Sequence, residues 1–186
     1  MQSLEAFGLK VLLLLISVIF NFYQFCVLMR FLLQAVKADF RNPFSQFLIK
    51  VTKPFLHPLR RIIPGFYGLD LAALFLFYAL FCVENSLNML IIFQYWSAFS
   101  FLTSLIGGLH FYLNTVFFLI LINSLMSWFP QARFHPTGIL IQLLTEPYLK
   151  QIRRVLPLIG GFDLSPLVAI ILIQIANMGF SMLLPH

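Results

Sequence analysis

The chain has 186 residues, of which 61% are hydrophobic and 10% are charged. Soluble domains have roughly 45–50% apolar and about 25% charged residues, so this chain has too little polar surface to fold in water. The composition excludes a soluble enzyme, a nucleic-acid-binding domain and a disordered chain, and it predicts an all-α membrane protein.

Four apolar stretches are long enough to cross a bilayer, which takes about 20 residues. From Leu71 to Ala132 the only formal charge is Glu84, which leaves room for two spans joined by the uncharged connection Gln94–Gly108. The predicted transmembrane helices are 11–33, 71–93, 109–129 and 164–184.

The basic residues between these stretches predict the orientation. Eleven of the twelve Lys and Arg residues lie in two segments, 30–61 and 133–154. Basic segments beside apolar helices normally stay in the cytoplasm, and a third span between Leu71 and Ala132 would put the two segments on opposite sides. We therefore expect four spans, with both basic segments cytoplasmic and both termini outside.

The chain contains one unit twice. A shift of 93 residues places 52–71 on 145–164 without a gap, with ten identities in the thirty aligned positions that begin at Pro43 and Pro136. We infer tandem repeats at 1–93 and 94–186. Because each predicted repeat crosses the membrane an even number of times, the two repeats are parallel.

Each basic segment contains a helical stripe of apolar residues, at 55–63 in the first copy and 148–156 in the second. The pattern predicts short amphipathic helices that lie in the cytoplasmic interface. Pro54 and Pro147 would occupy the first turns, and Pro58 would shorten or kink the first helix.

An arginine pair ends each of these helices: Arg60 and Arg61 in the first copy, Arg153 and Arg154 in the second. One interpretation is topogenic charge that also binds anionic lipid headgroups. The other is a docking surface for a cytoplasmic protein, or a clamp on the aspartates that follow.

Those aspartates, Asp70 and Asp163, precede the second helix of each repeat. We expect Asp163 to pair with Arg153 or Arg154 and to fix the interfacial helix against the fourth span. Ser165 is predicted as the N-cap of that span and Pro166 as its first residue. Both aspartates would lie near the positive end of a helix dipole.

Polar residues inside the apolar stretches form a second candidate site. The shift of 93 relates Asn21 to Asn114 and Glu84 to Asn177. An ionisable residue at membrane depth indicates a functional site, whereas hydrogen bonding between helices is the structural alternative. We hypothesise a polar seam between the repeats, formed by these four residues.

Other chemistry has no support in the sequence. The four His are scattered, and Cys26 and Cys82 both lie in apolar runs without ligand spacing. No serine or threonine has a His and an acid arranged as a triad. We expect no catalytic residues, no metal and no cofactor.

The repeated motif resembles the YggT family of small bacterial and plastid membrane proteins. Its core is T-x-P-x-L-x-x-(I/L)-R-R-x-x-P, followed by Gly-x-Asp-Leu-Ser-Pro in the second copy. The first copy has Ala72-Ala73 in place of Ser-Pro. In the second copy the matching residues are Thr145, Glu146, Pro147, Arg153, Arg154, Pro157, Gly161, Asp163, Ser165 and Pro166.

The resemblance implies a plasma membrane (bacterial inner membrane) protein linked to osmotic or salt stress, to cation uptake or to the organisation of membrane complexes. We expect a non-enzymatic accessory or scaffold protein. Its partners would be anionic lipid headgroups and an envelope or cytoplasmic protein, with no nucleic acid. The alternative is a homo-oligomeric protein for cation (potassium) uptake or permeation, since four helices leave little room for a pore within one chain.

Overall fold

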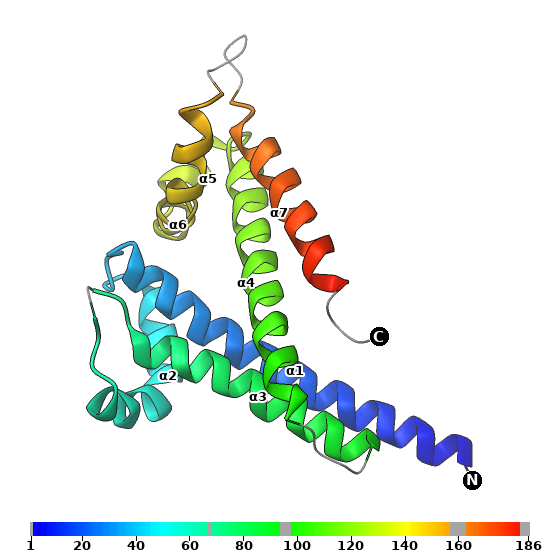
Figure 1. Ribbon diagram of the computed structural model, residues 1–186. Coiled ribbons are helices and arrows are strands. Elements are labelled where there is room, and N and C mark those ends of the chain that lie inside the picture. The colour runs from blue at the N-terminus through cyan, green and yellow to red at the C-terminus, as the bar shows by residue number, and fades with distance from the viewer. Residues whose placement is uncertain (1, 67, 94–97, 157–162, 183–186) are drawn as a thin grey trace. The chain divides into compact units, whose positions relative to one another are not determined.

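The computed structural model describes residues 2–66, 68–93, 98–156 and 163–182 (Figure 1). The regular elements in these residues are helices, and one isolated β-bridge joins Phe66 to Leu69. The prediction of an all-α fold is therefore confirmed. In chain order the helices are α1 (Gln2–Ala35), α2 (Pro43–Ile62), α3 (Leu71–Phe93), α4 (Phe99–Met126), α5 (Pro130–Phe134), α6 (Pro136–Arg153) and α7 (Ser165–Ser181).

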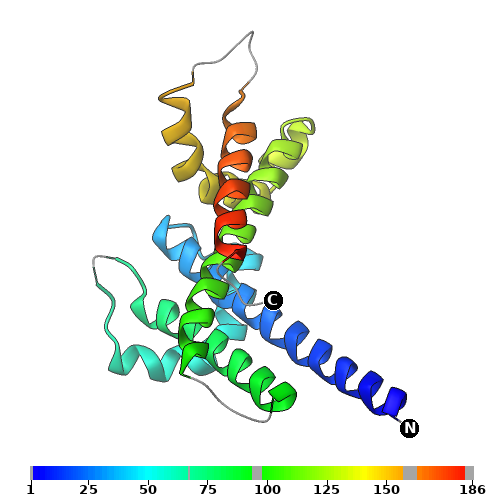
Figure 2. The same ribbon diagram turned by 45° about the vertical axis from the view of Figure 1, so that its right-hand side comes forward.

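The helices belong to two compact units. The first unit comprises Met1–Phe31 and Leu48–Gly108, and the second comprises Leu32–Phe47 and Leu109–His186. The interfacial helix of the first repeat, α2, lies mostly in the first unit, and α6 lies in the second. In the second unit α4 and α7 run side by side in both views (Figure 1 and Figure 2).

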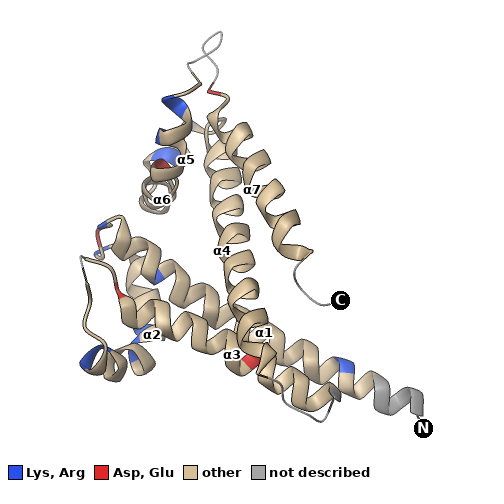
Figure 3. Ribbon diagram, viewed as in Figure 1, with Lys and Arg blue, Asp and Glu red and all other residues tan. Residues whose placement is uncertain are grey.

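Among the described residues, three helices are long and apolar enough to cross a membrane: Phe7–Ala35 within α1, Leu71–Ile92 within α3, and α4. The fourth apolar helix, α7, is shorter, with 17 residues. It begins where the fourth span is predicted to begin, but positions 183 and 184 of that prediction lie outside the described residues. Figure 3 shows few charges on these helices, while Lys and Arg gather on α2, on α6 and in the loops.

The third apolar helix begins earlier than the sequence predicts. Residues 99–108, expected as a connection, form the first part of α4, and positions 94–97 lie outside the described residues. Gly107 and Gly108 do not end this helix, because glycine is well tolerated in membrane helices. A Cβ on Gly108 would lie 3.5 Å from the rings of Phe77 and Phe81, an ordinary van der Waals distance, so α4 packs on α3 here without requiring a glycine.

Both interfacial helices, α2 and α6, also begin earlier than predicted. They start at Pro43 and Pro136, which the shift of 93 relates, so the prediction that Pro54 and Pro147 occupy the first turns is wrong. These two prolines lie inside the helices. Pro58 does not shorten α2 either, since the helix continues to Ile62.

Side-chain caps explain the earlier start of these helices. The Phe44 N–H donates to Asn42 Oδ1 over 2.9 Å at the start of α2. The Thr137 N–H donates to His135 Nδ1 over 3.3 Å at the start of α6. In both helices a proline follows the capping residue, at a position where its missing N–H costs nothing.

Candidate functional site

A buried threonine in each interfacial helix joins it to the first helix of the same repeat. Thr52 and Thr145 are both 0% exposed and are related by the shift of 93. Arg30 Nη1 of α1 donates to Thr52 Oγ1 over 2.6 Å, and Asn123 Nδ2 of α4 donates to Thr145 Oγ1 over 2.8 Å. Arg30 and Asn123 are themselves equivalent positions, so each repeat contains the same threonine contact.

Each threonine also donates its own hydroxyl proton to its helix. Thr52 Oγ1 donates to the Leu48 carbonyl over 2.7 Å, and Thr145 Oγ1 donates to the Ile141 carbonyl over 2.9 Å. Both hydroxyls therefore donate one hydrogen bond and accept another, which offsets the free-energy cost of burying a polar group. Sequence reasoning gave these threonines no role. The signal was present, because a polar residue at 30 and 123 recurs with the same shift.

The second contact in each repeat is an arginine–aspartate pair. Arg60 Nε donates to Asp70 Oδ2 over 3.1 Å, and its Nη2 also binds that oxygen. Arg153 Nε donates to Asp163 Oδ2 over 2.9 Å, and Arg153 Nη2 lies 2.9 Å from the same atom. The structure thus brings the first arginine of each predicted pair to the predicted aspartate. The second arginines, Arg61 and Arg154, are exposed.

The same aspartates cap the helices that follow. Asp70 Oδ1 accepts from the Ala73 N–H over 3.2 Å, and Asp163 Oδ1 accepts from the Ser165 N–H over 2.9 Å. Because α7 begins at Ser165, the cap acceptor is Asp163 and not Ser165 as the sequence predicts. Pro166 lies in the first turn, as expected, one position later than predicted. A carboxylate accepts these N–H groups more strongly than a hydroxyl, since its charge also interacts with the helix dipole.

Electrostatics in the second repeat favours the ion pair. Partial burial works against the charged form of Asp163, but hydrogen bonds from Ser165 and the Arg153 guanidinium outweigh it and hold the pKa of this carboxyl below its usual range. Burial likewise opposes the charge on Arg153, whereas its bonds to Asp163 and Glu146 raise its pKa. Asp163 is 32% exposed and Asp70 is 3% exposed, so the carboxylate of the first repeat is far better shielded from water, whereas Arg60 and Arg153 are about equally exposed.

In each unit, a polar residue that the sequence singled out is hydrogen-bonded to a neighbouring apolar helix. Gln24 Nε2 donates to Glu84 Oε2 over 2.8 Å between α1 and α3. Asn177 Nδ2 donates to Asn114 Oδ1 over 3.0 Å between α7 and α4. Asn21, predicted beside Glu84, is exposed, and the fully buried Gln24 one turn later occupies that position. The polar seam between the repeats stays a prediction.

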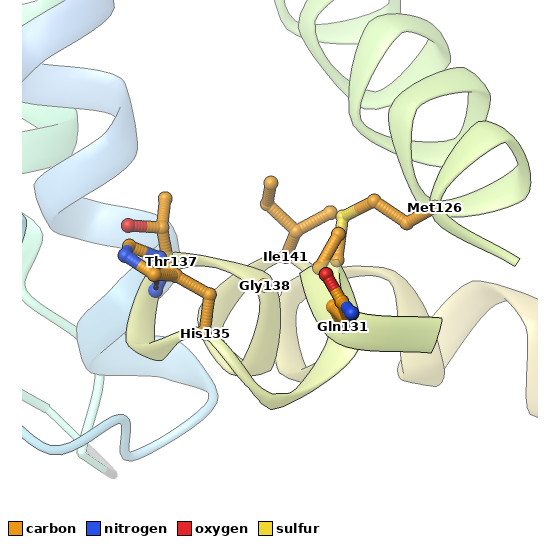
Figure 4. Close-up of a pocket in the computed structure, with 7 residues that line it drawn as sticks. Met126, Gln131, His135, Thr137, Gly138 and Ile141 are labelled. Atoms are coloured by element: carbon orange, nitrogen blue, oxygen red, sulfur yellow. Dashed lines mark hydrogen bonds between the residues drawn. The ribbon is translucent and has the colours of Figure 1, made fainter. Parts of the chain in front are cut away.

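An open cavity of about 420 Å³ lies in the second unit where α4, α5 and α6 meet (Figure 4). Its lining is largely apolar and includes Met126, Gly138 and Ile141, with His135 as the titratable residue. The imidazole of His135 is already used as the cap of α6. In the described part of the chain, no three His, Cys, Asp or Glu residues come together as a group that could hold a metal ion.

These features define a class of protein: an all-helical membrane protein in which two related helical repeats each fasten an amphipathic basic helix to the ends of apolar helices. Comparison with known proteins narrows the class to a family. The profile of the CCB3/YggT family matches the chain twice, over residues 9–91 and 102–184. The chain belongs to the CCB3/YggT family, and its tandem repeats are repeats of that unit.

Relatives of two sizes are found. A protein of Vibrio alginolyticus encoded in the proC 3′ region is 43% identical over 173 residues, which cover 88% of this chain and 89% of that protein. YggT of Escherichia coli K12 is 38% identical over 170 residues, covering 89% and 86% of the two chains. The ycf19 protein of Guillardia theta is 34% identical over 85 residues, which are 42% of this chain but 89% of that protein. It therefore matches about one repeat. No solved structure matches.

Proposed function

We propose that this protein is a non-enzymatic accessory or scaffold protein of the bacterial inner membrane. In this proposal it presents two interfacial helices at the cytoplasmic surface, where they organise other envelope proteins and contribute to tolerance of osmotic or salt stress. The observation that carries the proposal is the pair of contacts that holds each interfacial helix. The threonine contact and the arginine–aspartate pair fix α2 and α6 at two points each.

Rigid helices of this kind suit docking because little conformational entropy is lost on binding. The residues left exposed on them include large apolar side chains and basic groups. Phe55 is 60% exposed and Ile62 is 78% exposed on α2, and Val155 just after α6 is 81% exposed. Arg61 and Arg154 are exposed near these side chains in the sequence. A surface that combines apolar anchors with arginine fits the membrane interface and the usual composition of protein-binding sites.

Cation permeation is the alternative function, and the arrangement around Glu84 gives it little support. Within the first unit the Glu84 carboxyl is engaged by Gln24, a residue with 0% exposure, and this contact lies between two helices of the same repeat. A cation path would need this carboxyl to face a continuous polar lumen. A hydrogen-bonded pair between packed helices is what structural interhelical contacts in membranes require.

One experiment separates the two functions. A photoreactive amino acid is placed at Phe55 or Val155 in the full-length protein, and native membranes are irradiated before mass spectrometry. As matched controls, the same probe is placed at Phe22 or Leu172, which are exposed on the apolar helices α1 and α7. The scaffold proposal expects a specific protein adduct at the interfacial positions and none at the controls. Lipid adducts alone at all four sites would contradict it.

The flux measurement is the complement. Purified protein in proteoliposomes is expected to give potassium flux equal to that of empty vesicles. Flux above this background that falls in the Glu84→Gln variant would overturn the scaffold proposal in favour of permeation.

A further inference from the structure

Arg30 is a buried guanidinium with unused hydrogen-bond donors. It is 7% exposed, and both of its hydrogen bonds in the described part of the chain use Nη1, to Thr52 Oγ1 over 2.6 Å and to the Ile49 carbonyl over 3.2 Å. A guanidinium carries five N–H donors. The donors on Nε and Nη2 therefore have no acceptor among the described residues. A buried charge is costly unless it is paired, so this arrangement is incomplete.

The charges nearest to Arg30 do not neutralise it. Arg60 and Asp70 are the charged groups that act on it electrostatically, and the Asp70 carboxylate is already ion-paired with Arg60. Two guanidinium groups thus lie near one carboxylate, which is ion-paired with Arg60, and the local charge is one positive in excess (+2 − 1 = +1). The partner that would complete the cluster is an anion.

The second repeat shows that this excess is not a general feature of the fold. At the position equivalent to Arg30 it has the neutral Asn123. Its arginine, Arg153, is bound by two carboxylates, Asp163 at 2.9 Å and Glu146 at 3.1 Å, so this cluster carries one negative charge (+1 − 2 = −1). Lys53 stands at the position of Glu146 in the first repeat. The two repeats share the threonine contact and the arginine–aspartate pair, but the net charge around the pair is positive in the first repeat and negative in the second.

We propose that the Arg30–Arg60 cluster of the first repeat binds a phosphate group, and that the equivalent cluster of the second repeat does not. Guanidinium groups bind phosphate oxygens through paired N–H donors, and buried arginines suit this role because they are weakly hydrated. Arg30 lies five residues before the end of the apolar helix α1, so in the proposed arrangement it would be close to the lipid phosphates at the cytoplasmic surface. The phosphate can come from an anionic lipid headgroup or from soluble phosphate.

This inference deepens the proposed function, because it rests on the basic segments lying at the membrane surface, but it requires no protein partner. Its failure is therefore separate from that of the scaffold proposal. A protein adduct at Phe55 without a phosphate site would retain the scaffold, and a phosphate site without any adduct would retain the site.

The test measures lipid binding to the full-length protein in detergent by native mass spectrometry, with phosphatidylglycerol compared with diacylglycerol, which lacks the phosphate group. Arg30→Gln removes the charge while leaving an amide that can still donate to Thr52. Arg133→Gln removes one exposed charge from the second repeat and is the matched control. We expect Arg30→Gln to weaken phosphatidylglycerol binding by about tenfold or more, as loss of a charge-assisted hydrogen bond predicts, while Arg133→Gln leaves it near the wild-type value. Equal loss in both variants would mean general charge attraction and would overturn the proposal.

A second measurement needs no variant and so remains valid if Arg30→Gln does not fold. Phenylglyoxal modifies accessible arginines, and the modified positions are found by peptide mass spectrometry. Phosphatidylglycerol or inorganic phosphate is expected to protect Arg60, whose side chain is 38% exposed, but not the exposed Arg154. Protection by the lipid alone identifies a headgroup site, and protection by inorganic phosphate at equal concentration identifies a soluble ligand. Absence of protection by either, or equal protection of Arg154, would refute the site.

Discussion

The buried hydroxyl of Thr52 accepts a hydrogen bond from the guanidinium of Arg30, which is also buried. We predict that Thr52→Val lowers the free energy of unfolding by about 1–3 kcal/mol, since it deprives a buried charged donor of its acceptor. Thr145→Val leaves only a neutral amide unpaired and should cost about 1 kcal/mol. Thermal or denaturant unfolding in detergent measures both.

Ser127→Ala is the control for these two variants. Ser127 is exposed and its hydroxyl donates to the Ser124 carbonyl three residues earlier, so its loss should change stability little. An effect of Thr145→Val equal to or larger than that of Thr52→Val would show that the charge on Arg30 does not govern the threonine contact.

Asp163 should give stability a pH dependence at acidic pH. Its pKa is lower in the folded protein than the ordinary value of about 3.9. The stabilising contribution is therefore complete above the unfolded-state pKa and is lost as the pH falls through the lower folded-state pKa. Between about pH 5 and pH 2 the wild type should lose more stability than Asp163→Asn. Asp39→Asn, at an exposed turn, should behave as the wild type does. Parallel curves for wild type and Asp163→Asn would argue against the ion pair.

Two substitutions of Glu84 separate the effect of its hydrogen bond to Gln24 from the effect of its charge. Glu84→Gln keeps an acceptor for the Gln24 amide and should remain within about 0.5 kcal/mol of the wild type. Glu84→Leu leaves a fully buried amide without a partner and should cost on the order of 1–2 kcal/mol in the same unfolding experiment. If Glu84→Leu were as stable as Glu84→Gln, the pair would not be a structural contact.

At the scale of elements, the junction of α5 and α6 depends on one glycine. A Cβ on Gly138 would lie 2.1 Å from the Ala132 carbonyl oxygen, which is backbone and cannot move aside cheaply. Gly138→Ala should therefore destabilise the protein by about 1–3 kcal/mol. Gly179→Ala in α7 is the matched control, because nothing lies within 4 Å of its added Cβ. It should stabilise by up to about 1 kcal/mol, since glycine is a poor helix former. Equal effects of the two changes would mean that the α5–α6 junction is not close-packed.

The element boundaries show what sequence patterns can and cannot provide. Apolar runs located α3 and the start of α7 to within one residue, and the end of α1 to within two residues. They did not locate the starts of α1, α2, α4 and α6, and α1 begins at Gln2, nine residues before the predicted start. Helix entry at Pro43 and Pro136 depends on the capping side chains Asn42 and His135, and histidine is not a residue that capping rules emphasise. The charged contacts of Arg60 and Arg153 were accessible from sequence, since opposite charges recurred at one fixed spacing.

At the scale of the whole molecule, the number of membrane crossings determines where the basic segments lie. With four spans, α2 and α6 are on the same side. In a background of Cys26→Ala and Cys82→Ala, we expect His57→Cys and Gln151→Cys, both at exposed positions, to react with a membrane-impermeant thiol reagent from the cytoplasmic side alone. Labelling of the two sites from opposite sides would require an odd number of crossings between them.

The tandem organisation of the whole chain was predictable from sequence, but the polar partners inside the apolar helices were not. The shift of 93 identified Asn21 and Asn114 as equivalent, yet one turn of helix separates Asn21 from Gln24, the residue that contacts Glu84. Equivalent positions need not make equivalent contacts. Residues one turn apart lie on the same face of a helix, so either of them can contact a polar residue of the neighbouring helix. Contacts made by residues identical in both copies, such as Thr52 and Thr145, kept their partners.

The difference between Arg30 and Asn123 has a genetic consequence. In a homodimer of a one-repeat protein, such as a chain of the length of ycf19, every codon change appears in both subunits, so a charge useful in one subunit must be tolerated in the other. Joining two copies in one reading frame removes that constraint. Each half can then mutate alone, and a cationic half can exist beside an anionic half in every molecule the cell makes.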